Sequence, residues 1–402
     1  MSEWKSLSSI TSKIGSGSTP RGGNSVYSDS GISFIRSQNV LDMDFSTENL
    51  AFINDSQAEK LNNVIVEKND ILLNITGDSI ARCTVVPEEI LPARVNQHVS
   101  IIRCKNTEES KYVMYYLQYM KKYLLQISKV GGTRNALTKE AIGKLPIKIS
   151  DDCNKISKIL DNIDQKIQTN NQINQELEVM AKTLYDYWFV QFDFPDQNGK
   201  PYKSSGGKMV YHPELKREIP EGWGVEKLGD ITICHDSKRV PLSSNDRELV
   251  KGEIPYYGAT GIMDYVNDYI FDGDYVLMAE DGSVMTEKGT PILQRISGKN
   301  WVNNHAHVLE PVKNHSCKLL MMLLKDVSVM QIKTGSIQMK INQENMNKIV
   351  VPAIPLELLF EINQKLEVVD KQQLNLIEEN KQLTQLRDWL LPMLMNGQVK
   401  VE

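Results

Sequence analysis

Residues 95–102 read VNQHVSII and residues 302–309 read VNNHAHVL, so an asparagine and a histidine recur two positions apart in both strings. Similar strings flank them in the same order, with an offset of about 205 residues. Further matches pair KNDILLNITGDSI (68–80) with FDGDYVLMAEDGSV (271–284), GGTRNALTKEAIGKLPI (131–147) with GSIQMKINQENMNKIVV (335–351), and the segment from Leu160 with that from Leu366. Four matches in one order indicate a tandem duplication, which predicts a globule and a helix, each present twice.

Each repeated globule shows the short apolar runs that are typical of β-strands. Residues 71–75, 99–103 and 275–279 are mainly apolar or β-branched. Residues 112–127 suit an amphipathic helix, with residues 319–330 as their counterpart. We therefore expect an α+β chain that contains two tandem α/β globules.

A long helix follows each globule. Apolar residues recur at alternating spacings of four and three, the a/d pattern of a coiled coil. The predicted seam consists of Ile156, Leu160, Ile163, Ile167, Asn174, Leu177 and Leu184 in the first helix, and Ile362, Leu366, Val369, Leu376, Asn380, Leu383 and Leu390 in the second. The two helices are expected to pair antiparallel within the chain, and the polar residues in mid-seam to set the register.

These patterns divide the chain into successive segments. We expect a first globule at 1–150, a helix at 151–190, a connecting linker at 191–224, a second globule at 225–354, a second helix at 355–396 and a tail at 397–402.

Composition excludes several classes of protein. The chain has 402 residues with 24% charged residues, no apolar run that would span a bilayer, and no apolar signal core at its start. Its five cysteines are scattered without a CxxC pair, which excludes a disulfide framework and a structural zinc site. We expect a cytoplasmic protein that does not contact a membrane.

The formal net charge of −5 is unevenly distributed. Residues 1–150 carry a net +3 and residues 225–355 a net −2, whereas the two helical segments carry −3 each. The globules are therefore close to neutral, and any contact with a polyanion must use local patches or the charge of a partner.

Motifs for catalysis are missing from the sequence. Neither a GxxxxGK[ST] phosphate loop nor a GxSxG nucleophile elbow occurs, nor does the Asn/Asp-Pro-Pro-aromatic string of amino-methyltransferases. His305 and His307 lie near His315 and Cys317, but the first half offers only His98, so no metal site and no bound cofactor are expected.

Polar side chains suited to reading base edges concentrate in the irregular stretches. Arg pairs with guanine edges, and Asn or Gln with adenine edges. Matched residues of the two halves, such as Asn96 and Asn303, are assigned mainly to the scaffold, and Tyr256 to the core. The candidate DNA-binding residues are Arg21, Arg36, Gln38, Asn39, Arg134, Asn135, Lys238, Arg239, Gln338 and Lys340.

The stretch after the first helix adds a specific string, WFVQFDFP at 188–195, followed by GKPYKSSGG at 199–207 and LKREIPEGW at 215–223. Together with the duplication, it closely resembles the specificity subunit of type I restriction-modification enzymes, over essentially the whole chain. The resemblance implies two target-recognition domains, each reading one half of a bipartite site in double-stranded DNA, held apart by the paired helices. It also implies two modification subunits and restriction subunits as partners, which bring S-adenosylmethionine, ATP and Mg, and a chain without catalytic residues.

Two alternatives remain open. An enzyme with two active sites would need reactive groups at matching positions. The candidate pairs are Asn96 with Asn303, Asp70 with Asp274 and His98 with His305. A pure coiled-coil scaffold would explain the helices, but not two diverged globules with polar loops.

Overall fold

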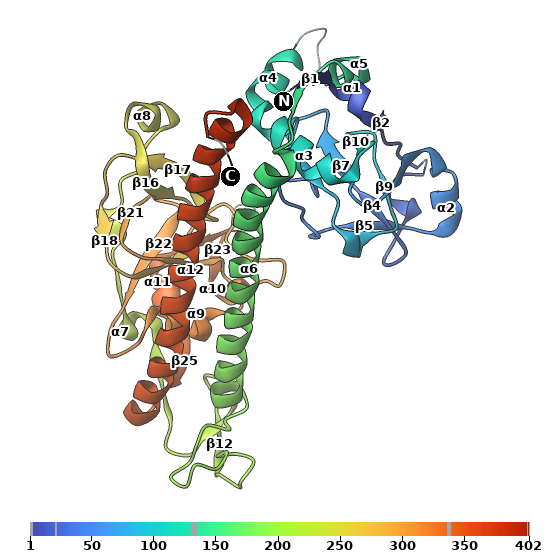
Figure 1. Ribbon diagram of the computed structural model, residues 1–402. Helices are drawn as coiled ribbons and strands as arrows, with labels where there is room; N and C mark the ends of the chain where they lie inside the picture. Colours follow the sequence, from blue (N-terminus) through green and yellow to red (C-terminus); the bar gives the residue numbers. More distant parts are fainter. Residues whose placement is uncertain (1–2, 21, 130–134, 336–338, 400, 402) are drawn as a thin grey trace. The chain divides into compact units, whose positions relative to one another are not determined.

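A computed structural model describes residues 3–20, 22–129, 135–335, 339–399 and 401 (Figure 1). It divides into two compact units, each of which is described by itself. Unit 1 comprises Met1–Asn171 with Glu378–Glu402, and unit 2 comprises Gln172–Ile377. Each unit therefore takes one globule and a part of both long helices, so the units do not follow the sequential division that the sequence suggested.

Unit 1 contains two sheets. The strands of the first sheet, in spatial order, are β2 (Thr11–Ser16), β10 (Val99–Cys104), β7 (Ile71–Asn74) and β8 (Cys83–Val85). Those of the second are β3 (Tyr27–Ser28), β5 (Ala51–Ile53), β4 (Ile32–Ile35), β9 (Ala93–Val95) and β6 (Ile65–Val66). A separate antiparallel pair joins β1 (Glu3–Ser6) to β11 (Pro146–Ile149).

Strand β7 shows how unit 1 is layered. Ile71 and Leu73 pack in a core with the helices, whereas Leu72 packs in a second core with Phe34 and Val95 of the other sheet. Side chains alternate along a strand, and because β7 is buried on both faces its first three residues are all apolar. The helices of this unit are α1 (Leu7–Ile10), α2 (Asp55–Glu59), α3 (Ser110–Tyr119), α4 (Lys121–Ile127) and α5 (Lys139–Gly143).

Unit 2 repeats this plan. Its first sheet orders β15 (Thr232–Cys234), β22 (Ala306–Pro311), β19 (Tyr275–Ala279) and β20 (Leu293–Ile296), and its second orders β17 (Ile262–Val266), β16 (Lys251–Tyr257), β21 (Lys299–Val302) and β18 (Phe271–Asp272). The strands β14 (Gly224–Lys227) and β25 (Val350–Ala353) form the pair that corresponds to β1 and β11, and β23 (Lys333–Thr334) pairs with β24 (Lys340–Ile341). The short helices are α7 (Leu228–Ile231), α8 (Ser244–Leu249), α9 (Cys317–Leu324), α10 (Val329–Ile332) and α11 (Gln343–Asn347).

Strand pairing confirms the duplication. In each unit the second sheet contains one parallel pair, β4 with β9 and β16 with β21, among antiparallel neighbours. Val276 and Met278 of β19 pack in the helical core, and Leu277 packs in the other core, as in β7. The predicted helices at 112–127 and 319–330 are each broken into two, α3 with α4 and α9 with α10.

The two long helices are α6 (Cys153–Tyr185), which continues as a π-helical turn (Asp186–Val190), and α12 (Leu356–Asn396). Within unit 1 they pair antiparallel: Arg387 donates to Asp164 at 2.8 Å, and Asn170 donates to Asn380 at 2.8 Å. The Asn170 side chain is fully buried. A buried polar pair in the seam disfavours any alignment of the two helices in which its members lose each other as partners. This is the effect expected of residues that set the register of the helix pair.

Unit 2 contains the remaining part of the helix pair. Gln373 donates to the backbone carbonyl of Asn174 at 3.1 Å, and the Lys365 ammonium lies 5.9 Å from the centre of the Trp188 ring. The two chain directions are again opposite. None of the predicted seam residues is classed as exposed in the structure.

The segment that connects the first long helix to the second globule, residues 191–224, contains a cluster of packed aromatic side chains. Phe194 stacks on Tyr202 and on Trp223, with ring centres 4.9 and 5.3 Å apart. The hairpin of β12 (Met209–His212) and β13 (Arg217–Pro220) lies within the same segment. In the described part of the chain, no helix is long and apolar enough to cross a membrane.

Candidate nucleic-acid interface

Unit 1 has a polar groove of about 910 Å³ at the end of strand β7. The turn between β7 and β8, the loop after β4 and the connection from β9 to β10 all open into it. Its lining residues are Ser37, Gln38, Thr76, Gly77, Asp78, Ser79, Arg82, His98, Asn135 and Ala136. Connections between strands thus place polar side chains on a rigid sheet scaffold, as recognition surfaces require.

Backbone hydrogen bonds hold these loops in place. The Ile75 N–H donates to the carbonyl of His98, and the Leu137 N–H donates to the carbonyl of Ile75, both at 2.9 Å. The buried Asn74 amide donates to the carbonyl of Ser37 at 2.8 Å, which ties the loop after β4 to β7. The Asn96 side chain accepts from the His98 N–H at 3.1 Å, in agreement with its predicted scaffold role.

Both ring nitrogens of His98 are engaged. Nδ1 lies 2.6 Å from the Thr76 hydroxyl, and Nε2 lies 3.3 Å from the Gln97 amide nitrogen. Gln97 in turn accepts from the Thr19 hydroxyl. This chain of contacts sets the orientation of the ring toward the groove.

Three donors in the groove remain uncommitted. Within the described residues, the side chains of Arg82 and Asn135 have no hydrogen-bond or ion-pair partner, and Gln38 has only a long contact of 3.4 Å to the carbonyl of Asn49. Asp78 is the single acid among the lining residues. A guanidinium and two amides in one groove match the donor and acceptor patterns of base edges and phosphates.

Asn39, predicted as a base contact, is instead a structural residue. Its side chain is fully buried, accepts from the Arg36 N–H at 3.0 Å and donates to the carbonyl of Ser46 at 2.9 Å. Arg36 itself donates to the carbonyl of Asn49 at 2.7 Å and lies over the Tyr27 ring. The Asn39 and Arg36 side chains thus hold the loop after β4 in shape. The sequence pattern could not distinguish this structural role from a contact with DNA.

Unit 2 builds the equivalent position with different chemistry. The Glu280 N–H donates to the carbonyl of His305 and the Ile341 N–H to that of Glu280, both at 2.8 Å, as Ile75 and Leu137 do in unit 1. Asp281 therefore occupies the place of Thr76, and its carboxylate lies 2.5 Å from Nδ1 of His305. The two units thus share the backbone hydrogen bonds at this position but present different side chains, Thr76 in one and Asp281 in the other. Two domains that recognise different sequences would differ in this way.

Two predicted contacts of unit 2 are committed to a partly buried charge network. Arg239 is bonded to Glu280 at 2.6 Å and to Asp236 at 3.2 Å, so its guanidinium is not free for a base edge, which corrects the prediction. Lys340 is half exposed and bonded to Glu280 at 2.9 Å. Lys238 is exposed. Burial by itself would raise the pKa of the Asp236 carboxyl, but the hydrogen bond and charge of His307, with Cys234 and Arg239, lower it below its usual range.

The same network explains a potential metal trio. Among the described residues, Cys234, Asp236 and His307 place one ligand atom each within 4.8 Å of one another. However, His307 already bonds Asp236 through Nδ1 and the carbonyl of Ile341 through Nε2. Burial raises the pKa of the Cys234 thiol to about 12, so the thiolate that a metal needs is disfavoured. The trio fits a hydrogen-bonded charge cluster better than a metal site.

The remaining predicted residues divide into two groups. Arg21, Arg134 and Gln338 lie outside the described residues. Tyr256 is 1% exposed and its hydroxyl accepts from the Leu242 N–H at 2.9 Å, so its predicted core position is confirmed.

Sequence reasoning missed Arg82. The available signal was its place directly after the TGDSI turn that joins two apolar runs. Nothing in the sequence showed that its partner-free side chain opens into a groove.

The duplicated fold and the polar loops at its groove are features of a recognition protein with two similar domains. A family model described as type I restriction modification DNA specificity domain matches residues 1–179 and 220–385. The chain therefore belongs to this family, and it is a DNA sequence-specificity subunit of the type I restriction-modification kind.

Individual proteins with similar sequences are specificity subunits too. The chain is 26% identical over 340 residues to the type I restriction enzyme MjaIX specificity subunit of Methanocaldococcus jannaschii, covering 77% of this chain and 74% of that one. It is 33% identical over 154 residues to a putative type I restriction enzyme specificity subunit of Haemophilus influenzae, a match that spans only 39% of that relative and 38% of this chain.

A solved structure supports the fold. The S subunit of a type I restriction-modification system from M. genitalium matches with a TM-score of 0.53 at 14% identity, covering 98% of this chain and 95% of that one. The tandem globules with long helices are thus a known arrangement.

Proposed function

We propose that the groove of unit 1 reads one half of a bipartite DNA site and the equivalent surface of unit 2 reads the other half. The observation that carries this proposal is the contrast at matching positions, where the same backbone frame presents Thr76 beside His98 in one unit and Asp281 beside His305 in the other. In this proposal Arg82, Gln38 and Asn135 contact DNA in the first half-site.

We also propose that the chain itself has no catalytic activity and works in the cytoplasm. S-adenosylmethionine, ATP and Mg then act on partner subunits, because the sequence lacks the motifs that would bind them. The purified chain incubated with DNA, S-adenosylmethionine, ATP and Mg should neither methylate nor cleave the DNA. Methyl transfer by the chain alone would contradict this part of the proposal.

The paired helices are proposed to set the separation of the half-sites and to dock two modification subunits. Large apolar side chains are exposed on both helices: Val179 and Met180 on α6 and Val368 on α12 in unit 2, and Leu386 and Trp389 on α12 in unit 1. These are apolar groups on the helices that such an interface would bury. Trp389→Ser should weaken binding of the modification subunit in sedimentation experiments without lowering the melting temperature.

The methylated sequences of a host that expresses the chain with its modification subunit test the reading of half-sites. A chain with Gln38, Arg82 and Asn135 changed to Ala should lose or relax specificity in one half-site only. Asp281→Thr, made separately, should affect the other half-site only. If either variant alters both half-sites, or neither variant alters any, the assignment of one half-site to each unit is wrong.

A further inference from the structure

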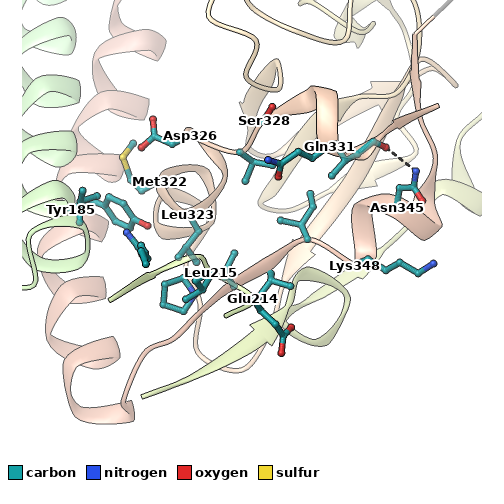
Figure 2. Close-up of a pocket in the computed structure, with 18 residues that line it drawn as sticks. Tyr185, Glu214, Leu215, Met322, Leu323, Asp326, Ser328, Gln331, Asn345 and Lys348 are labelled. Atoms are coloured by element: carbon teal, nitrogen blue, oxygen red, sulfur yellow. Dashed lines mark hydrogen bonds between the residues drawn. The ribbon is translucent and has the colours of Figure 1, made fainter. Parts of the chain in front are cut away.

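The pocket of unit 2 that Figure 2 shows is not the counterpart of the groove in unit 1. It has a volume of about 520 Å³ and lies beside the end of α6, the helices α9 to α11 and strand β25 (Figure 2). Asn345, one of its lining residues, donates to the carbonyl of Ile332 at 3.0 Å. None of the described residues that line it belongs to the turn between β19 and β20, the loop after β16 or the connection from β21 to β22. The counterpart of the groove is therefore located from backbone contacts that both units share.

The loops after β4 and β16 correspond through their parallel strand pairs. Ile35 and Tyr257 are the last residues of β4 and β16, and each pairs with the last residue of its parallel neighbour, β9 or β21. Gln38 and Thr260 each follow three residues later. Thr260, which is exposed, thus stands in unit 2 where the Gln38 amide stands in unit 1.

The other two donors of the groove are replaced by apolar side chains. The N–H of the last residue of β7 donates to the carbonyl of Arg82 at 2.8 Å, and that of the last residue of β19 donates to the carbonyl of Ile292 at 3.1 Å. Asn135 and Met339 each directly precede a residue that forms an isolated bridge to the turn after β7 or β19. Ile292 therefore replaces Arg82, and Met339 replaces Asn135.

The amides at this surface of unit 2 are bonded within the chain. The Gln294 amide nitrogen donates to two carbonyls of the loop after β16, both at 2.9 Å. The Asn303 amide nitrogen donates to the sulfur of Met263 at 3.3 Å, and its oxygen accepts from the His305 N–H at 2.8 Å. These amides hold the loops together and are not free for base edges.

Met263 is the apolar side chain that a β-bulge presents at this surface. The register of β16 against β17 shifts between Tyr256 and Tyr257, which leaves Met263 as the extra residue of β17. A bulge re-aims a side chain and is common beside functional sites. Met263 is 55% exposed, and Ile262 beside it is 46% exposed. A Cβ at Gly258 would collide with the Met263 sulfur, so the glycine leaves room for this side chain.

We propose that Met263 is a specificity-determining residue of unit 2 and contacts the C5-methyl group of a thymine in the half-site that this unit reads. This inference rests on the proposed function and names the base chemistry of one half-site. Thymine presents its methyl group in the major groove, where an apolar side chain distinguishes it by contact. Unit 1 then reads its half-site through hydrogen bonds, and unit 2 reads its half-site in part through an apolar contact.

The first experiment replaces each thymine of the recognition site by deoxyuridine, one position at a time. Uracil keeps the base pair and lacks only the methyl group, so the change isolates the proposed contact. The full chain assembled with its modification subunit is titrated with each duplex. At one or more thymines of a single half-site the affinity should fall about fourfold, the effect of one buried methyl group. If deoxyuridine changes the affinity at no position, the proposal is wrong.

The second experiment connects that loss to Met263. Met263→Ala should bind the thymine duplex as weakly as the unchanged chain binds the uracil duplex, and deoxyuridine at that position should cause no further loss. Met263→Leu also loses the sulfur contact with Asn303 but keeps a large apolar side chain, so it should retain the preference for thymine. If Met263→Ala keeps the full preference, another side chain reads the methyl group and the proposal is overturned.

A control variant truncates an apolar side chain elsewhere in unit 2. Ile233 of β15 is 48% exposed and lies outside the loops of this surface. Ile233→Ala should therefore match the unchanged chain with every duplex. The melting temperature of both Met263 variants should stay close to that of the unchanged chain, because the side chain is largely exposed. The deoxyuridine titrations with the unchanged chain test the proposal even if a variant is unstable.

Further outcomes separate this inference from the proposed function. If the assembled chain binds all duplexes alike, without preference in either half-site, the proposed function fails first. If both half-sites are recognised but no thymine depends on Met263, only this inference fails. Thymines that depend on Met263 in both half-sites would contradict the assignment of one half-site to each unit, and the inference with it.

Discussion

Arg82 provides the sharpest test of how unit 1 contacts DNA. Its guanidinium opens into the groove without a partner among the described residues, while its backbone carbonyl accepts from the Asn74 N–H at 2.8 Å. Arg82→Ala therefore removes no hydrogen bond or ion pair among the described residues, and the free energy of unfolding should change by less than about 1 kcal/mol. Any loss of DNA binding then reflects the interface.

The expected loss follows from the kind of contact. If Arg82 pairs with a guanine edge, Arg82→Ala should cost about 1–3 kcal/mol, or about 5-fold to 150-fold in affinity, and relax one position of one half-site. If it contacts only phosphate, binding should weaken for all sequences and the slope of log affinity against log salt should shrink by about 0.9.

Arg82→Lys distinguishes the two cases. Lysine retains the charge but lacks the planar fork, so it should preserve a phosphate contact and lose a base contact. Affinity for randomised duplexes at several salt concentrations, measured with the chain assembled with its modification subunit, provides the readout. Lys60→Ala is the control, because Lys60 is exposed in the same unit and does not line the groove. Unchanged affinity, salt slope and sequence preference in Arg82→Ala would refute the role of this residue.

Other predictions concern the helices and the stability of unit 2. Asp164→Ala should lower the free energy of unfolding by about 2 kcal/mol in urea titrations. The Arg387 guanidinium, 13% exposed, then keeps only Asp388 as an ion-pair partner, and the buried Tyr115 hydroxyl loses its acceptor. A loss below about 0.5 kcal/mol would contradict this. Duplicating residues 169–172 together with the opposite residues 379–382 lengthens both helices by about 6 Å. Methylome sequencing should then show unchanged half-sites separated by about one or two more base pairs. Altered half-sites at an unchanged spacing would show that the helices do not set the distance between the half-sites. The Lys251 ammonium, the Tyr265 N–H and Arg247 lower the pKa of Asp264 to about 2. The ionised Asp264 carboxylate therefore stabilises the fold above its ordinary pKa near 3.8, and this stabilisation is lost as the pH falls toward 2. The melting temperature of the Asp264→Asn variant should drop less between pH 6 and pH 3 than that of the unchanged chain, and equal drops would contradict this prediction.

Repetition and periodicity determined the architecture from the sequence alone. The matched strings around Asn96 and Asn303 showed the duplication, and the a/d spacing predicted two long paired helices, because side-chain period and turn residues are local properties of the chain. The mainly apolar run at 71–75 also predicted a β-strand, which the structure contains as β7.

Only the tertiary structure decided which polar side chains are free. Asn39, Arg239 and Arg82 look alike in the sequence as polar residues of irregular stretches, yet the first is buried in its own loop, the second is ion-paired, and the third has no partner in the described chain. The difference depends on contacts between residues distant in sequence, such as Arg239 with Glu280. The helix register likewise follows from where Asn170 meets Asn380, because a seam pattern specifies which face is buried but not which residues oppose one another.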